Sequence, residues 1–528
     1  MRKIFSLLLS SLFSTFVFAN NIQISNVAVN GNNITFTLSW ENSWNTTNNT
    51  LPEYPNNWDA VWIFVKYQSG VNNLWTHVVL SATSANHSVT GAGGVLQVNA
   101  VTDGIGVFVR RSSPGGGNIS GATVTLAMTG LPAGPLNFKV FGIEMVHCPT
   151  GSFQIGDGNG GPLGNPINFR NQIIDATVQS NGIPGSGLYN SISTFEFSPD
   201  VPNTFPMGYN GFYIMKYEAS HEQYADFLNT LTYTQQERRT NTAPNSSIGT
   251  KAIANSGTGF IFGTTGIIEI ITPGTNNILP AVYGCDFTDD NNFNNINDGQ
   301  NIALEGVGTA DWLAYLDWSG LRPMTEMEFE KACRGTRPAV IHEYAWGSTE
   351  ISCRQRVIVS QGITFQQLTN WGEAGEGAPG TAVNGMCFCG VGITIDNPGD
   401  GTARNGIFAS SATGRKTSGA GFYGAMDLSG SVHEFCIKVD NTYLILGSSP
   451  FNGTHGNGLL NSNGDADVSN WPGENFGPSN LNGIGIKGGS WQDSSTDIFK
   501  VSYRFNGILS VNTNRNRSLG IRGVRTYY

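Results

Sequence analysis

Short runs of alternating apolar and polar residues fill the chain from residue 22 to residue 146. They are rich in β-branched and aromatic side chains, and turns of Gly, Asn and Pro separate them; examples are NITFTLSW, AVWIFVKY, GIGVFVRR and NFKVFGIEMV. Several strands at this spacing are typical of a β-sandwich. We therefore expect residues 20–146 to form a β-sandwich domain of the immunoglobulin or fibronectin kind, with a structural or presenting role.

The pattern becomes helical in places after Cys148. In SHEQYADFLNTL, Ser220 and Gln223 fit a capping box, and the apolar residues that follow recur at helical spacing: Tyr224, Phe227, Leu228 and Leu231. TADWLAYLDWSG and TEMEFEKACRG predict two more helices. Beyond residue 336 loops predominate, with strand signals near 486–491, 499–505 and 519–526. The fold class expected is α+β, with a second, loop-rich domain over residues 147–528.

The first residues have the pattern of an export signal. Arg2 and Lys3 precede a largely apolar run, and Val17-Phe18-Ala19 offers a small-residue cleavage site. We expect a signal peptide over residues 1–19 with cleavage after Ala19, and a product that is secreted or held at the outer cell surface. No second apolar run approaches the length of about 18 residues that a transmembrane helix needs.

Composition narrows the classes of partner. The net charge is −10, only 12% of residues are charged, and glycine occurs 68 times. An acidic chain argues against nucleic acid as a partner and leaves room for divalent cations. Two loops rich in Asp and Asn, 285–299 and 461–471, lack the EF-hand spacing, so solvated turns are favoured over calcium loops for both.

Cysteines and histidines give no strong metal motif. In an oxidising compartment up to three disulfides could form, but the pairing stays open. The pair Cys387 and Cys389 could form a soft metal site, although a loop or disulfide role is favoured because no ligand at matching spacing accompanies it. The histidines are scattered, without a His-x-x-x-His pair. The cysteines are Cys148, Cys285, Cys333, Cys353, Cys387, Cys389 and Cys436.

Seven motifs follow one another in a recognisable order from residue 151 to residue 525. They are GSFQIGDG, GFYIMKYEASHEQYADFLNTL, AYLDWSGLRPMTEMEFEKACRG, YAWGS, GAMDLSGSVHEF, KGGSW and GIRGVR. This series resembles the formylglycine-generating enzyme, or sulfatase-modifying factor, family over about 148–528. The resemblance implies a compact fold related to C-type lectins and poor in regular secondary structure.

The same resemblance implies that this chain lacks the metal ligands of the family's oxidases. The family oxidises a sulfatase cysteine with oxygen and a copper ion held by two cysteine thiolates, in a Cys-x-x-x-x-Cys spacing soon after Gly-Gly-Ser. Here Asp493 stands where the first cysteine is expected, and no cysteine follows Cys436. Carboxylates are hard ligands, unsuited to monovalent copper. A related branch uses iron held by histidines, partly from a helical domain absent here. We therefore expect neither copper nor iron.

A calcium site is the metal feature that the resemblance retains. DLSGSVHE matches the family segment in which two side chains and two backbone carbonyls bind one ion. The resemblance carries these roles to the side chains of Asp427 and Glu434 and the carbonyls of Gly430 and Val432. Hard oxygen ligands suit calcium. The alternative is a turn whose Glu434 pairs with an arginine.

Three functions stay open at this point. The first is a non-catalytic exported protein that binds a glycan, a protein or peptide, or copies of itself. Its ligand would meet the surface where the family has its substrate groove, through Trp491, Asp493, Arg504, Asn506, Asn512, Asn514 and Arg515, because Trp, Arg and Asn suit sugar and peptide recognition.

The other two functions differ in kind from the first. An enzyme with altered chemistry could use Ser490, His433 and Asp493, provided that they lie within hydrogen-bond reach. A self-assembling surface or filament subunit would pair edge strands of the sandwich with its neighbours.

Overall fold

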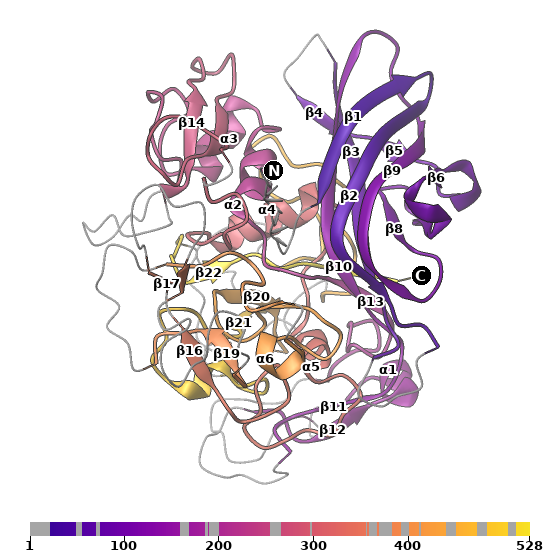
Figure 1. Ribbon diagram of the computed structural model, residues 1–528, viewed down its shortest axis with the longest axis vertical. Coiled ribbons are helices and arrows are strands. Elements are labelled where there is room, and N and C mark those ends of the chain that lie inside the picture. The colour runs from indigo at the N-terminus through magenta and orange to yellow at the C-terminus, as the bar shows by residue number, and fades with distance from the viewer. Residues whose placement is uncertain are drawn as a thin grey trace, which may run out of the picture.

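The computed structural model describes most of the chain (Figure 1). The described residues are 22–48, 55–69, 74–158, 168–184, 188, 200–253, 266–295, 298–354, 356–357, 367–368, 383–391, 401–410, 413–439, 450–472, 483–504 and 514–527. The signal peptide expected over residues 1–19 lies outside them. No helix among the described residues has the length and apolar character needed to cross a membrane.

A five-stranded sheet forms the outer layer of the N-terminal region. Its strands are β1 (Gln23–Asn30), β2 (Asn33–Asn45), β9 (Gly115–Thr129), β5 (Val79–Leu80) and β6 (Ser88–Thr90), all paired antiparallel. Along β2 every second side chain is buried, namely Ile34, Phe36, Leu38 and Trp40. This period of two places one face of the sheet on the core.

A seven-stranded sheet lies beneath it and joins the two regions of the chain. It contains β7 (Leu96–Ala100), β8 (Val107–Arg111), β3 (Asp59–Ser69), β4 (Trp75–His77), β10 (Leu136–Cys148), β13 (Phe212–Met215) and β23 (Val524–Thr526). β10 pairs with β3 from the N-terminal region and with β13 from the C-terminal region. The domain boundary expected between residues 146 and 147 therefore lies inside one strand. The immunoglobulin or fibronectin topology stays a prediction.

Strand β3 is buried on both faces because it lies between two layers. Val61, Ile63 and Val65 pack with the outer sheet, whereas Trp62 and Phe64 point to the opposite side. There the indole Nε1 of Trp62 donates to the Ser319 carbonyl at 2.8 Å. The continuous apolar run AVWIFV thus matches a strand with protein on either side.

Six helices are present among the described residues, all of them in the C-terminal region. They are α1 (Ala176–Asn181), α2 (His221–Leu228), α3 (Tyr233–Arg239), α4 (Thr309–Trp318), α5 (Glu326–Arg334) and α6 (Arg415–Ser418). The three helices predicted from the sequence are confirmed as α2, α4 and α5. The predicted capping box is present at Ser220 with Gln223, and a second one lies at Thr325 with Glu328.

The remaining strands are short, and loops connect them, as expected. They are β11 (Phe153–Ile155), β12 (Gln172–Ile174), β14 (Ile268–Thr272), β15 (Val282–Cys285), β16 (Ser352–Arg354), β17 (Arg356–Val357), β18 (Gln367–Leu368), β19 (Met386–Phe388), β20 (His433–Ile437), β21 (Ile484–Lys487) and β22 (Leu519–Gly520). Three 3₁₀ turns are also present among the described residues: η1 (Ser84–Asn86), η2 (Ala92–Gly94) and η5 (Thr496–Phe499). The strand predicted near 499–505 is wrong for residues 499–504, because Phe499 ends η5 and a bend and turn follow it. The described chain is mostly β with few helices.

Candidate functional site

A tight turn after β21 builds the candidate site. Gly488 and Gly489 both have positive φ, and a Cβ on Gly489 would lie 2.5 Å from the ring of Phe499. Only glycine combines this backbone with so close an approach. The turn places Ser490 and Asp493 beside His433, the first residue of β20. β20 is the central strand of the sheet β21-β20-β22.

Asp493 lies at the centre of the turn. Its Oδ2 atom accepts hydrogen bonds from the backbone nitrogen and the hydroxyl of Ser490, each at 2.7 Å. Nε2 of His433 lies 2.9 Å from the same oxygen. Burial by itself would raise the pKa of Asp493, but the hydrogen bond from His433 and those from Ser490 outweigh it, so the pKa lies below its ordinary value. The carboxylate is thus held in its charged form.

The order of these three side chains differs from that of a serine hydrolase. There the histidine lies between serine and aspartate and accepts the serine proton. Here the Ser490 hydroxyl donates to Asp493, and the other ring nitrogen of His433, Nδ1, is buried without a partner among the described residues. The three residues are within hydrogen-bond reach, as an altered enzyme would require, but the serine is not bonded to the base.

The segment expected to bind calcium forms a compact loop before β20. Asp427 and Ser431 have φ of 61° and 64°, an uncommon conformation for residues other than glycine. A Cβ on Gly430 would lie 2.4 Å from the carbonyl oxygen of Phe388, which also accepts from the Ser431 backbone nitrogen at 2.9 Å. The loop is therefore pressed against β19.

Two buried carboxylates, those of Glu434 and Glu218, lie beside this loop. Oε1 of Glu434 accepts from Nε of Arg522 at 2.6 Å, so Glu434 has the arginine partner that the alternative to a calcium site requires. The Oε2 atom of Glu434 is buried without a partner among the described residues. Glu218, which the sequence did not point to, accepts from the Ser431 hydroxyl at 2.6 Å and from the Val432 backbone nitrogen at 3.1 Å.

Burial is the main influence on the pKa values of Glu434, Asp427 and Glu218. It raises the pKa of Glu434 to about 7 and also raises the pKa of Asp427. The pKa of Glu218 lies well above its ordinary value, because burial and the neighbouring charges of Asp427 and Glu434 all disfavour its ionised form. A dication would relieve this repulsion, and the free Glu434 oxygen fits such a ligand in chemistry. The carboxylate oxygens of this group do not converge as a ready cluster, however.

One cluster of metal-ligand type does converge within the described part of the chain, and it consists of sulfur. Cys353, Cys387 and Cys389 place their Sγ atoms within 4.8 Å of one another. Cys353 and Cys389 form a disulfide. The cluster adjoins the candidate site, because the backbone nitrogen of Gly390 donates to the Asp493 carbonyl at 3.0 Å. No sequence motif links Cys353 to the other two cysteines.

The residues expected to bind a ligand lie in three different places. Trp491 and Asp493 are in the turn, where the indole Nε1 of Trp491 donates to Glu305 at 2.9 Å. Arg515 makes two hydrogen bonds to Asp311 in the first turn of α4, at 2.8 and 2.9 Å. Asn514, beside it, is exposed. Asn506 and Asn512 lie outside the described residues.

Arg504 is an interior residue and not a surface one. Its guanidinium makes two hydrogen bonds to Glu326 at 2.6 and 2.8 Å, and its side chain is 1% exposed. The planar group also stacks 4.1 Å from the ring centroid of Phe169. Ligand contact requires an exposed guanidinium, which this arrangement does not provide. Arg504 thus fixes the start of α5 instead.

The comparison with known families agrees with these features. The sequence matches the family model described as the sulfatase-modifying factor enzyme 1-like domain over residues 143–527. The match starts inside β10 and ends in the last described residues, so it includes the turn, the loop and the sulfur cluster. No curated protein matches the chain. Because the match covers more than half of its length, the chain belongs to the sulfatase-modifying factor enzyme 1-like domain family.

Proposed function

We propose that this chain is an exported, non-catalytic binding or structural protein that presents a calcium-stabilised sulfatase-modifying-factor-like domain at or outside the cell surface. The proposal rests on the position and the hydrogen bonds of Asp493. It occupies the position that the resemblance gives to the first copper thiolate, and its Oδ2 atom accepts from Ser490 and His433. A hard carboxylate already bonded in this way does not supply a ligand for monovalent copper.

The proposed ligand surface consists of Gln492 and Asp493 in the turn and of the segment 514–518. Trp491 links the two, because its Nε1 atom also lies 3.3 Å from the Arg517 carbonyl and its ring lies 5.3 Å from the guanidinium of Arg517. Asp493 is partly exposed and Asn514 is exposed. A glycan or a peptide suits such a surface, since both offer hydroxyl or amide groups to carboxylate and amide side chains.

Calcium has a stabilising role in this proposal. Asp427 and Glu434 would supply side-chain oxygens, and Gly430 and Val432 would supply carbonyls. The support is the chemistry of the group: hard oxygen donors, a free buried Oε2 on Glu434 and carboxylates whose pKa values burial raises. The ion would offset the cost of burying these charges.

Array binding tests the ligand surface. The full-length secreted chain is applied to glycan and peptide arrays with calcium or with a chelator, and bound metals are measured by mass spectrometry. We expect a restricted set of ligands, weaker binding by Asn514→Ala, and unchanged binding by Asn292→Ala, an exposed asparagine in another loop. Copper or iron bound in stoichiometric amount would contradict the proposal.

A hydrolytic enzyme is the second candidate, because Ser490, His433 and Asp493 do lie together. Its test is labelling by a serine-directed fluorophosphonate probe, with Ser490→Ala as the control. The non-catalytic proposal predicts no labelling that depends on Ser490, since the hydroxyl donates to a carboxylate and not to a base.

Self-assembly is the third candidate. Strand β1 lies at the edge of the five-stranded sheet, and Val27 and Val29 are 43% and 42% exposed. Exposed apolar edge strands can pair with other chains. Light scattering after size-exclusion chromatography decides the point: a monomer at all concentrations would remove this candidate, and concentration-dependent growth that charged substitutions at Val27 abolish would support it.

A further inference from the structure

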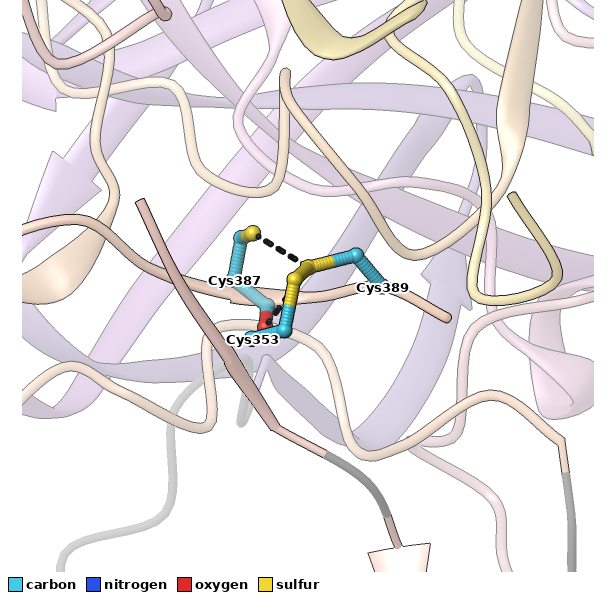
Figure 2. A group of neighbouring side chains, drawn as sticks. All are labelled: Cys353, Cys387 and Cys389. Atoms are coloured by element: carbon cyan, nitrogen blue, oxygen red, sulfur yellow. Dashed lines mark hydrogen bonds between the residues drawn. A yellow bond between two sulfur atoms is a disulfide. The ribbon is translucent and has the colours of Figure 1, made fainter. Parts of the chain in front are cut away.

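Two paired strands bring three cysteines to one face. Cys353 lies in β16 and Cys387 in β19, and the two are direct partners in a parallel ladder. Cys389 follows two residues after Cys387. Because residues two apart in a strand point to the same side, all three side chains meet on one face of the ladder, as Figure 2 shows.

The third sulfur lies at reacting distance from the disulfide. Cys353 and Cys389 are bonded, with Cα atoms 5.2 Å apart. The Sγ atom of Cys387 lies 3.1 Å from the Sγ atom of Cys389. This distance falls within the range of about 3–3.5 Å that characterises near-attack arrangements. The free thiol and the disulfide are thus placed for exchange.

We propose that Cys353, Cys387 and Cys389 form a thiol–disulfide exchange site, in which the free thiol moves between Cys387 and Cys353. The Cys387 thiolate attacks Sγ of Cys389, the bond between Cys387 and Cys389 forms, and the bond between Cys353 and Cys389 breaks. The electron pair leaves on Cys353, which takes up the proton that Cys387 lost. The step consumes no oxidant or reductant, because one disulfide replaces another.

The exchange changes which sulfur an outside reagent can reach. Cys387 is buried in the hydrophobic cluster of this region, whereas Cys353 is half-buried. Moving the thiol to Cys353 therefore turns a concealed group into an accessible one. An external thiol or disulfide, small or part of a protein, would form its mixed disulfide at Cys353. This ligand class is independent of the glycan or peptide in the proposed function.

The surroundings set the rate of the step. Burial raises the pKa of Cys387, the Arg354 guanidinium opposes that rise, and the Asp427 carboxylate adds to it. Tyr344 also faces the thiol, and burial raises its own pKa to about 12. The thiolate is the attacking species, so exchange is slow near neutral pH and faster in base.

Backbone hydrogen bonds also link the sulfur cluster to the candidate site. The Phe388 carbonyl, between Cys387 and Cys389, accepts from Ser431 at 2.9 Å. Gly390 donates to the Asp493 carbonyl. A change in the disulfide partner of Cys389 would therefore act directly on the loop 427–431 and on the turn 490–493.

Alkylation of the full-length chain tests the site. The chain, purified without reductant, is incubated with a maleimide at about pH 7 and about pH 9, where thiolate fractions differ strongly. Non-reducing peptide mapping by mass spectrometry then identifies the labelled cysteine and the bridges. We expect label on Cys353 together with a peptide bridged between Cys387 and Cys389, appearing over minutes to hours and faster at the higher pH.

Two variants control the experiment. In Cys387→Ser the labelling of Cys353 should fall at least about tenfold, because the attacking thiolate is gone. Cys285→Ser removes a free buried cysteine elsewhere and should leave the labelling of Cys353 unchanged. Should Cys387→Ser fail to fold, the wild-type time course decides alone. Label confined to Cys387 with the original bridge intact would overturn the proposal, as would three reduced thiols holding a soft metal ion.

Discussion

Nε2 of His433 and Oδ2 of Asp493 lie 2.9 Å apart, at the position where the family resemblance places the first of two copper thiolates. Ser490 donates to the same oxygen at 2.7 Å. This contact joins β20 to the turn after β21. The resemblance assigns redox chemistry to this position, but here its side chain supports the turn through hydrogen bonds.

Replacement of Asp493 should therefore lower stability. In Asp493→Asn an amide replaces a carboxylate that accepts several hydrogen bonds, and we expect the free energy of unfolding to fall by about 1–3 kcal/mol. Denaturant unfolding measures this change. Asp497→Asn, four residues on, is the matched control, since Asp497 pairs with Lys500 on the surface and should change stability by less than about 1 kcal/mol. Equal losses in the two variants would contradict the role given to Asp493.

The same variant should change the pH dependence of stability. The pKa of folded Asp493 lies below its ordinary value, which is about 3.9 in an unfolded chain. Its contribution is therefore fully present above the unfolded pKa and is lost as the pH falls through the folded pKa. Unfolding curves should separate wild type from Asp493→Asn above about pH 5 and bring them together in stronger acid. A difference in stability between wild type and Asp493→Asn that grows in acid would contradict this prediction.

Calcium should raise the melting temperature of the full-length chain. Binding to the folded state alone adds about 2.7 kcal/mol when the free ion is at 100 times its dissociation constant. We expect a chelator to abolish the shift, Asp427→Ala to weaken it, and Asp286→Asn to leave it intact. Asp286 belongs to the loop 285–299, where its carboxylate accepts from the Asn291 backbone nitrogen at 2.8 Å. Identical melting with calcium and with chelator would remove the calcium proposal.

Arg504 should prove structural. Because Glu326 would be left buried and unpaired, Arg504→Ala should lower the free energy of unfolding by about 3–5 kcal/mol. Arg337→Ala removes an exposed arginine and should cost less than about 1 kcal/mol. Calorimetry of both variants compares them directly. A stable Arg504→Ala chain with impaired ligand binding would instead restore its expected surface role.

The shared sheet predicts a single unfolding transition. Trp62 in β3 packs with the helical side of the molecule and donates to Ser319 of the other region. We expect one calorimetric transition for the full-length chain, and Trp62→Ala should lower its temperature through a loss of about 3–5 kcal/mol. Two resolved transitions, with only the first shifted by Trp62→Ala, would show that the regions unfold separately.

Local patterns predicted the elements whose information lies within a few residues. The helix α2 follows from Ser220, Gln223 and the spacing of the apolar residues after them. The boundary in β10 could not be predicted, because its partner β13 lies more than sixty residues further along the chain, and NFKVFGIEMV reads equally well as the last strand of a separate sandwich.

The contacts of the site residues could not be predicted, because their partners lie far away in the sequence. Cys353 joins Cys389 only through the pairing of β16 with β19, across loops that carry no periodic pattern. Arg504 lies in a polar C-terminal region typical of a surface, yet Glu326 and Phe169 enclose it. Glu218 lies in the motif GFYIMKYEASHEQYADFLNTL, which assigns it no role, and its contacts appear only where Ser431 and Val432 approach it.

We propose that the domain binds a ligand and does not oxidise one. The most direct measurement incubates the full-length chain with a cysteine-containing sulfatase peptide, copper and oxygen, and follows the peptide by mass spectrometry. We expect the peptide thiol to stay unconverted, because Asp493 stands where the family's first copper thiolate is expected and no cysteine follows Cys436. Catalytic conversion of that thiol to an aldehyde would contradict the account.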